Sequence, residues 1–167
     1  ENLALAPSSG AQYRKARKEL LSFNKNTGFA ASDSKKILIN ILSAVEKDLN
    51  KISSKLENQV REHSSDWVDF NADEVFYLSQ GKIYGHYVLL KAASRDFKHL
   101  IVESKQYEKL TSLFKSFEDA ITLNPFIVRN GVVESVMAPN HLMSLNYYVI
   151  KANYVLAQIK NITRDLQ

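Results

Sequence analysis

The sequence contains no cysteine, and it has only five glycines and three prolines among 167 residues. The lack of cysteine excludes disulfide bonds, thiolate metal sites and thiol catalysis, and it removes redox chemistry as a guide to the cellular compartment. The scarcity of glycine and proline favours few, long secondary-structure elements. No hydrophobic run approaches the roughly 20 residues that a helix needs to span a bilayer. Because the numbering opens on Glu1 without methionine, we expect that a segment preceded it.

Sequence signatures of common enzyme classes are also missing. The chain has no Gly-x-Ser-x-Gly, no phosphate-binding loop and no dinucleotide fingerprint. A di-metal helical bundle needs two Glu-x-x-His pairs, and Asp96-x-x-His99 is the sole relative of that pattern. The spacing of the four histidines does not suggest a zinc site either. We therefore expect no metal and no cofactor.

Charge is distributed unevenly along the chain, although the formal net charge is only +4. Residues 11–36 carry a surplus of five positive charges, and residues 57–74 carry a surplus of five negative charges. The basic residues Arg14–Lys18 are compatible with nucleic acid or lipid headgroups, but a charge run of this kind is usually a solvated helix face, and we favour that interpretation. We do not expect a nucleic-acid partner.

Hydrophobic periodicity predicts an all-α fold. Apolar residues recur at alternating steps of three and four in four segments, which is typical of helices with one buried side. These segments are residues 33–63, 71–103, 107–123 and 140–163. A shorter helix is predicted over residues 11–23, after a flexible lead-in at residues 1–10. The pattern favours one domain, residues 11–167: an antiparallel up-down bundle of four long helices plus a short N-terminal helix.

Two further local structures follow from short motifs. Asn71 with Glu74 three residues later predicts a capping box at the start of the central helix, and Asn140 is the expected cap of the last helix. Asn130-Gly131 stands between β-branched residues, which is a hairpin signal. A small β-hairpin within residues 124–140 and a packed loop both fit this passage.

In an up-down bundle, the two longest connections and the starts of the second and fourth long helices share one end. That end gathers polar residues, with Trp67 and Asp69 beside them. The candidate binding residues are Asp73, Tyr77, Arg129, Asn130, Asn140 and His141. The positive ends of two helices favour an anion or carboxylate there, and they disfavour the protonated form of His141. The simpler alternative is that these residues cap helices and attach the loop.

Polar and small residues also interrupt the apolar pattern of the central helix. Gln80 and Ser94 occupy seam positions, where a buried polar group needs a partner and can fix the helix register. Gly81-x-x-x-Gly85 predicts a close-packing groove that admits a neighbouring helix, a ligand or a partner backbone.

Several short motifs in this order resemble an uncharacterised bacterial family, domain of unknown function 2333. They are Asp73–Tyr77, Gly81–Tyr84, Asp96–Phe97, Asn124–Pro125, Asn130–Gly131 and Pro139–Leu142. The likeness extends from Lys35 to the C-terminus. It implies a protein held in the bacterial inner membrane by an N-terminal anchor that this chain lacks, with a helical domain facing the periplasm. It implies no reaction.

These observations together predict a non-enzymatic binding or scaffold module of the bacterial cell envelope. We expect its partner to be another envelope protein. The alternative is a hydrolase-type enzyme that uses His141 as an acid or base beside Asp73. The sequence leaves the oligomeric state open.

Overall fold

The computed structural model describes residues 9–26, 31–62, 71–125, 128–130 and 140–166. Six helices contain 90% of these residues, and no sheet occurs among them, which confirms the expected all-α class. The helices are α1 (Ser9–Asn26), α2 (Ala31–Glu62), α3 (Ala72–Asp96), α4 (Lys98–Glu103), α5 (Tyr107–Thr122) and α6 (His141–Asp165).

The chain divides into two compact units, Glu1–Asp33 and Ser34–Gln167, called unit 1 and unit 2 below. Helix α1 lies in unit 1 and extends beyond its predicted limits of residues 11 and 23 at both ends, so Ser9 and Gly10 belong to a helix and not to a lead-in. Within this unit, Leu20 and Leu21 are exposed by 60% and 52%. The assignment of residues 11–167 to one domain stays a prediction.

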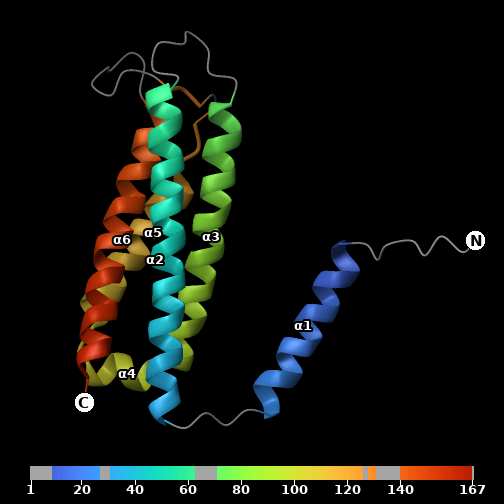
Figure 1. The fold of residues 1–167 in the computed structure, drawn as a ribbon, viewed down its shortest axis with the longest axis vertical. Helices are drawn as coiled ribbons and strands as arrows, with labels where there is room; N and C mark the ends of the chain where they lie inside the picture. Colours follow the sequence, from blue (N-terminus) through green and yellow to red (C-terminus); the bar gives the residue numbers. More distant parts are fainter. Residues whose placement is uncertain (1–8, 27–30, 63–70, 126–127, 131–139, 167) are drawn as a thin grey trace, which may run out of the picture. The chain divides into compact units, whose positions relative to one another are not determined.

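Four long helices of unit 2, α2, α3, α5 and α6, run side by side (Figure 1). The seams predicted on α2 and α6 are both buried, with no member more than 4% exposed. They consist of Leu38, Leu42, Val45, Leu49, Ile52 and Leu56 on α2, and of Leu142, Leu145, Val149, Ala152, Leu156, Ile159 and Thr163 on α6. Burial of such wide apolar stripes is the main favourable contribution to the stability of this unit.

Three pairs of polar side chains join α2 to α6. From one pair to the next, the residue number increases on α2 and decreases on α6. Glu46 pairs with Lys160, Asn50 accepts from Asn153 at 2.7 Å, and Glu57 accepts from Asn146 at 3.0 Å. The chain therefore runs in opposite directions in these two helices.

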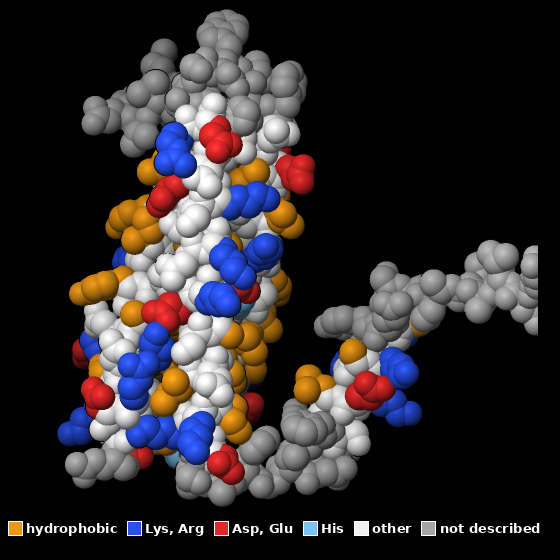
Figure 2. Space-filling view, viewed as in Figure 1, with side chains coloured by type: hydrophobic (Ala, Val, Ile, Leu, Met, Phe, Trp, Pro, Cys, Tyr) orange, Lys and Arg blue, Asp and Glu red, His pale blue; other side chains and the backbone are white. Residues whose placement is uncertain are grey.

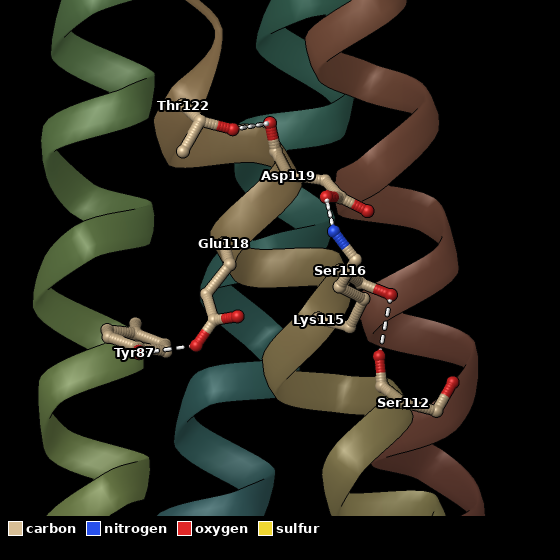
Figure 3. A network of polar contacts seen from close by, with 7 residues as sticks. All are labelled: Tyr87, Ser112, Lys115, Ser116, Glu118, Asp119 and Thr122. Atoms are coloured by element: carbon tan, nitrogen blue, oxygen red, sulfur yellow. Dashed lines mark hydrogen bonds and ion pairs between the residues drawn. The ribbon is translucent and has the colours of Figure 1, made fainter.

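Helices α3 and α5 are also joined by polar side chains. Figure 3 shows the Tyr87 hydroxyl directed at Glu118 of α5, to which it donates at 2.7 Å. Farther along α5, the Gln80 amide donates to the backbone oxygens of Ala120 and Ile121, both at 3.1 Å. Lower numbers on α3 again meet higher numbers on α5.

The central helix is shorter than predicted. We expected one helix to Glu103, but α3 ends at Asp96, and Phe97 separates it from α4. The amide of Phe97 still donates to Ala93, while its carbonyl accepts from Leu100 and Ile101. Helix α4 lies at an angle to the long helices, at the end of unit 2 where α6 ends (Figure 1). In this turn Leu100 and Ile101 are buried, at 7% and 5% exposure, and the burial of two large apolar side chains favours it.

Two other local predictions are wrong. Asn71 occupies the N-cap position of α3, but its backbone is helical and its side chain makes no capping hydrogen bond, so the capping box with Glu74 does not form. The three-and-four apolar spacing of residues 107–123 starts at Tyr107 and so predicts that its side chain is buried, but Tyr107 is 51% exposed.

The predicted β-hairpin is not found among the described residues of 124–140. These residues contain one isolated antiparallel bridge, between Asn130 and Asn140. Gly131, the second residue of the expected turn, lies outside the described residues.

Candidate functional site

The start of α6 is held by the residue that the sequence indicates. Asn140 has an extended backbone, and its side-chain oxygen accepts from the amide of Met143 at 2.9 Å. This is the N-cap geometry, in which one of the unpaired amides of the first helical turn finds an acceptor. The prediction of Asn140 as the cap is therefore confirmed.

Asn140 also connects two helices through Asn130. The side-chain amide of Asn140 donates to the side-chain oxygen of Asn130 at 2.9 Å, and the amide of Asn130 donates to the backbone oxygen of Gln59 at 3.1 Å. Asn130 thus links the last turn of α2 to the first turn of α6. Asn140 is buried, so these hydrogen bonds offset the cost of removing its polar side chain from water.

His141 and Arg129 are joined in two places. The amide of His141 donates to the carbonyl of Arg129 at 3.0 Å, and the amide of Arg129 donates to Nδ1 of His141 at 2.9 Å. Because Nδ1 accepts, the neutral ring carries its proton on Nε2. Burial, and then the positive charge of Arg129, lower the pKa of His141. The direction matches our expectation, but the cause that we gave, the helix dipole, is not among these.

Helix α3 holds the other end of the same connection. Asp73 accepts from the amide of Val128 at 3.2 Å, and the hydroxyl of Tyr77 donates to the carbonyl of Pro125 at 3.1 Å. The side-chain amide of Gln80 donates to the carbonyl of Leu123 at 2.7 Å, in addition to its bonds with α5. Gln80 therefore caps the C-terminal end of α5.

We define the connecting segment as Leu123–Pro125 together with Val128–Asn130, the described parts of the connection between α5 and α6. All six candidate binding residues belong to this segment or contact it or one another. The structure brings them to one end of unit 2, as predicted. Trp67 and Asp69 lie outside the described residues.

The comparisons with known proteins place the chain in a family. Residues 27–165 match the bacterial family described as "Uncharacterized protein conserved in bacteria (DUF2333)". The chain belongs to the DUF2333 family. No curated protein and no solved structure matches it. The family identified from the sequence motifs is thus confirmed, and it is a helical, bacterial family whose activity is uncharacterised.

Most polar atoms of this DUF2333 site already serve the fold. Asp73, Tyr77, Asn130, Asn140 and His141 each bind the connecting segment or its anchors, as the simpler interpretation of the sequence proposed. Gln80 has the same role and was not among the predicted site residues. Its seam position, where a polar side chain needs a partner, was the signal that indicated it.

The geometry of this DUF2333 chain can be compared with the two kinds of catalytic site considered from the sequence, an acid–base pair and a metal centre. No hydrogen bond joins Asp73 to His141 among the described contacts. The carboxylate of Asp73 accepts from the amide of Val128, and the ring of His141 accepts from the amide of Arg129, so both bind the connecting segment. Within the described part of the chain, no group of three or more acidic, histidine or cysteine side chains has the geometry to hold a metal ion. None of the described helices is both long and apolar enough to cross a bilayer.

Proposed function

We propose that this chain is a non-enzymatic binding or scaffold module of the bacterial cell envelope, and that its partner is another envelope protein. In this proposal, the chain is the periplasmic part of a protein anchored in the inner membrane. The observation that supports a binding role is the attachment of one irregular segment by side chains from several helices. Asp73 and Tyr77 on α3 and His141 on α6 all contact the backbone of the connecting segment.

An irregular segment held in this way suits recognition. A loop that is ordered before binding loses little conformational entropy when a partner docks, so more of the contact free energy appears as affinity. Helices α3 and α6 supply the rigid support, because both bury long apolar seams. The connecting segment is therefore a preorganised contact surface in our proposal.

The helix contacts favour an antiparallel up-down bundle as the scaffold of this surface. Numbering runs in opposite directions in α2 against α6, and in α3 against α5. Gln106, just before α5, donates to Thr163 near the end of α6 at 3.3 Å, which gives the same relation for that pair. An up-down connection of this kind brings the end of α5 and the starts of α3 and α6 together around the connecting segment.

Some groups at this end are available to a partner. Arg129 and Asp73 are exposed, and Tyr77 is 44% exposed. The backbone amide and carbonyl of Arg129 bind His141, but its guanidinium has no hydrogen bond or ion pair in the described part of the chain. Arginine and tyrosine are enriched among the residues that dominate protein–protein binding energy. We therefore propose Arg129 as the main contact residue.

The experiment is site-specific photo-crosslinking in the native bacterium, using the full-length protein. A photoreactive residue replaces Arg129, and the matched control replaces Arg164, an exposed arginine in the last turn of α6. We expect one discrete cross-linked protein at position 129 and none at position 164. Equal labelling at both positions, or none at 129, would remove the connecting segment as the binding surface.

A second measurement tests the direct role of Arg129 against a structural one. Arg129→Glu keeps the backbone bonds to His141, so the melting temperature should stay within a few degrees of the natural protein while co-purification of the cross-linked partner is lost.

Alkaline phosphatase fused to the C-terminus of the full-length protein tests the cellular location of this domain. Active fusions support the periplasmic orientation, and inactive fusions with normal protein levels contradict it.

A further inference from the structure

The outward side of α3 is apolar, and no other described helix of unit 2 lies along it (Figure 1). Large hydrophobic side chains between 44% and 56% exposed occur along it at steps of one, six, four and one: Tyr77, Leu78, Tyr84, Val88 and Leu89. Figure 2 shows hydrophobic side chains along the edge of unit 2 that α3 forms. At 100° per residue this side lies opposite the buried seam of Phe76, Ile83 and Leu90. A contiguous apolar helix face of this kind marks an interaction surface.

Two glycines lie at the centre of this face. A Cβ atom added to Gly81 or Gly85 would meet no other atom within 4 Å. The predicted close-packing groove is therefore not filled by another described helix of unit 2, and no described contact within this unit requires glycine at either position. Glycine inside a helix lowers helix stability relative to alanine. The spacing Gly-x-x-x-Gly instead allows the backbone of another helix to approach closely.

We propose that α3 packs antiparallel against α3 of a second copy of this chain, across a two-fold axis between Gly81 and Gly85. In this register, the residue numbers of any two opposed residues have the same sum as 81 and 85, the numbers of the two glycines. Gly81 then faces Gly85 of the second copy, Leu78 faces Val88, and Tyr77 faces Leu89. The same patch thus serves both copies, as a two-fold interface requires, and each glycine gap is flanked by large apolar side chains.

Charge at the two ends of the face favours this orientation. Glu74 is exposed near the start of α3, and Arg95 is exposed near its end. The antiparallel register places Glu74 at the level of Ala92 of the second copy, three residues or about 4.5 Å along the helix from Arg95. Opposite charges can therefore meet at both ends, whereas a parallel pair would oppose Glu74 to Glu74. The same register places Lys82 opposite Tyr84 of the second copy, while Asp96 lies beyond the opposed glycine and leucine positions, next to Arg95.

The first test measures dimerisation of the whole chain by sedimentation equilibrium. It uses a substitution that should weaken the dimer but stabilise the monomer. We expect a species of twice the chain mass at high concentration. Alanine at both Gly81 and Gly85 should weaken dimerisation about tenfold or more, because two added methyl groups separate the backbones. The same substitution should raise the melting temperature at low concentration, since each monomer helix gains from alanine.

Leu78→Glu is a second variant with the same expectation for dimerisation, and Tyr154→Glu is its matched control. Tyr154 is 68% exposed on α6, away from the proposed contact, so this variant should dimerise normally. A chain that stays monomeric at every concentration would overturn the proposal. So would a dimer that the Gly81 and Leu78 variants leave intact, because such a dimer would use another surface.

Charge exchange tests the antiparallel direction. Glu74→Arg and Arg95→Glu should each weaken dimerisation, because each creates like charges across the interface at both ends. The double variant should recover the natural dimerisation constant to within a few-fold. Failure of the double variant to recover, with circular dichroism unchanged, would exclude the antiparallel register. A chain that remains monomeric but binds an apolar helix from another protein through Leu78 would assign the face to that protein.

Discussion

Arg129 and His141 form a reciprocal pair although eleven residues separate them in the sequence. The amide of His141 donates to the carbonyl of Arg129, and the amide of Arg129 donates to Nδ1 of the His141 ring. The second bond requires an unprotonated Nδ1, because an imidazolium nitrogen is a donor. The attachment of the connecting segment to α6 is therefore sensitive to the charge of one histidine.

This relationship predicts a specific pH dependence of stability. Burial first, and then the charge of Arg129, lower the pKa of His141 below its usual value of 6.5. The unfolded chain thus binds this proton more readily, so the stabilisation is fully present above about pH 6.5 and is lost as the pH falls toward the lower pKa of the folded state. His141→Gln keeps an acceptor for the amide of Arg129 without a titrating group.

We expect the free energy of unfolding to fall less steeply below about pH 6.5 in His141→Gln than in the natural protein. Urea denaturation at a series of pH values measures both slopes. The pKa of His86 is also lowered, by burial and by Lys82 against the opposing effect of Asp48. His86 is present in both proteins, so the difference between the slopes isolates His141. Parallel curves would contradict the prediction.

Asn140 has two separable roles, which substitutions can distinguish. Asn140→Asp keeps an oxygen for the amide of Met143 but loses the donor to Asn130, whereas Asn140→Ala loses both bonds. We expect alanine to lower the free energy of unfolding by about 2 kcal/mol and aspartate by about 1 kcal/mol. Chemical denaturation at neutral pH measures this order. An aspartate variant as unstable as the alanine variant would mean that the bond to Asn130 dominates.

The side-chain NH2 of Gln80 shares its two hydrogens among three backbone oxygens at the end of α5. Gln80→Met keeps the length of the side chain but leaves these oxygens without their donor, and we expect a loss of about 1–3 kcal/mol. Hydrogen exchange should also become faster in the last turn of α5 than in its first turn. Uniform acceleration along α5 would point to global destabilisation and not to a lost cap.

Replacing Asn146 by an apolar residue should not lower the free energy of unfolding, in contrast to the substitutions of Asn140 and Gln80. Its side chain is fully buried and donates to Glu57 at 3.0 Å, while its Oδ1 has no partner within the described part of the chain. Glu57 is exposed and can be hydrated without this bond. Asn146→Leu should therefore be as stable as the natural protein or more stable by about 1 kcal/mol. A loss of more than 2 kcal/mol by thermal denaturation would show that Asn146 has a favourable role that its partners do not reveal.

The long helices of this chain could be predicted from its sequence because local signals specify them, although the exact end of α3 could not. The seams of α2 and α6 follow a three-and-four spacing that only a helix turns into one face, and every predicted member of both is buried. Asn140 was found as a cap because its bond to Met143 spans three residues. The gathering of the candidate residues at one end followed from helix lengths and alternating directions alone.

Tertiary structure decided what those residues do. Asp73 binds Val128, 55 residues away, and Tyr77 binds Pro125, 48 residues away, so both partners depend on how α3 packs beside α5. The end of α3 at Asp96 depends on the apolar surface that Leu100 and Ile101 reach when the chain turns. The exposure of Gly81 and Gly85 depends on which side of α3 its neighbours cover. Local spacing indicates which residues form a helix face, but only packing determines what that face meets.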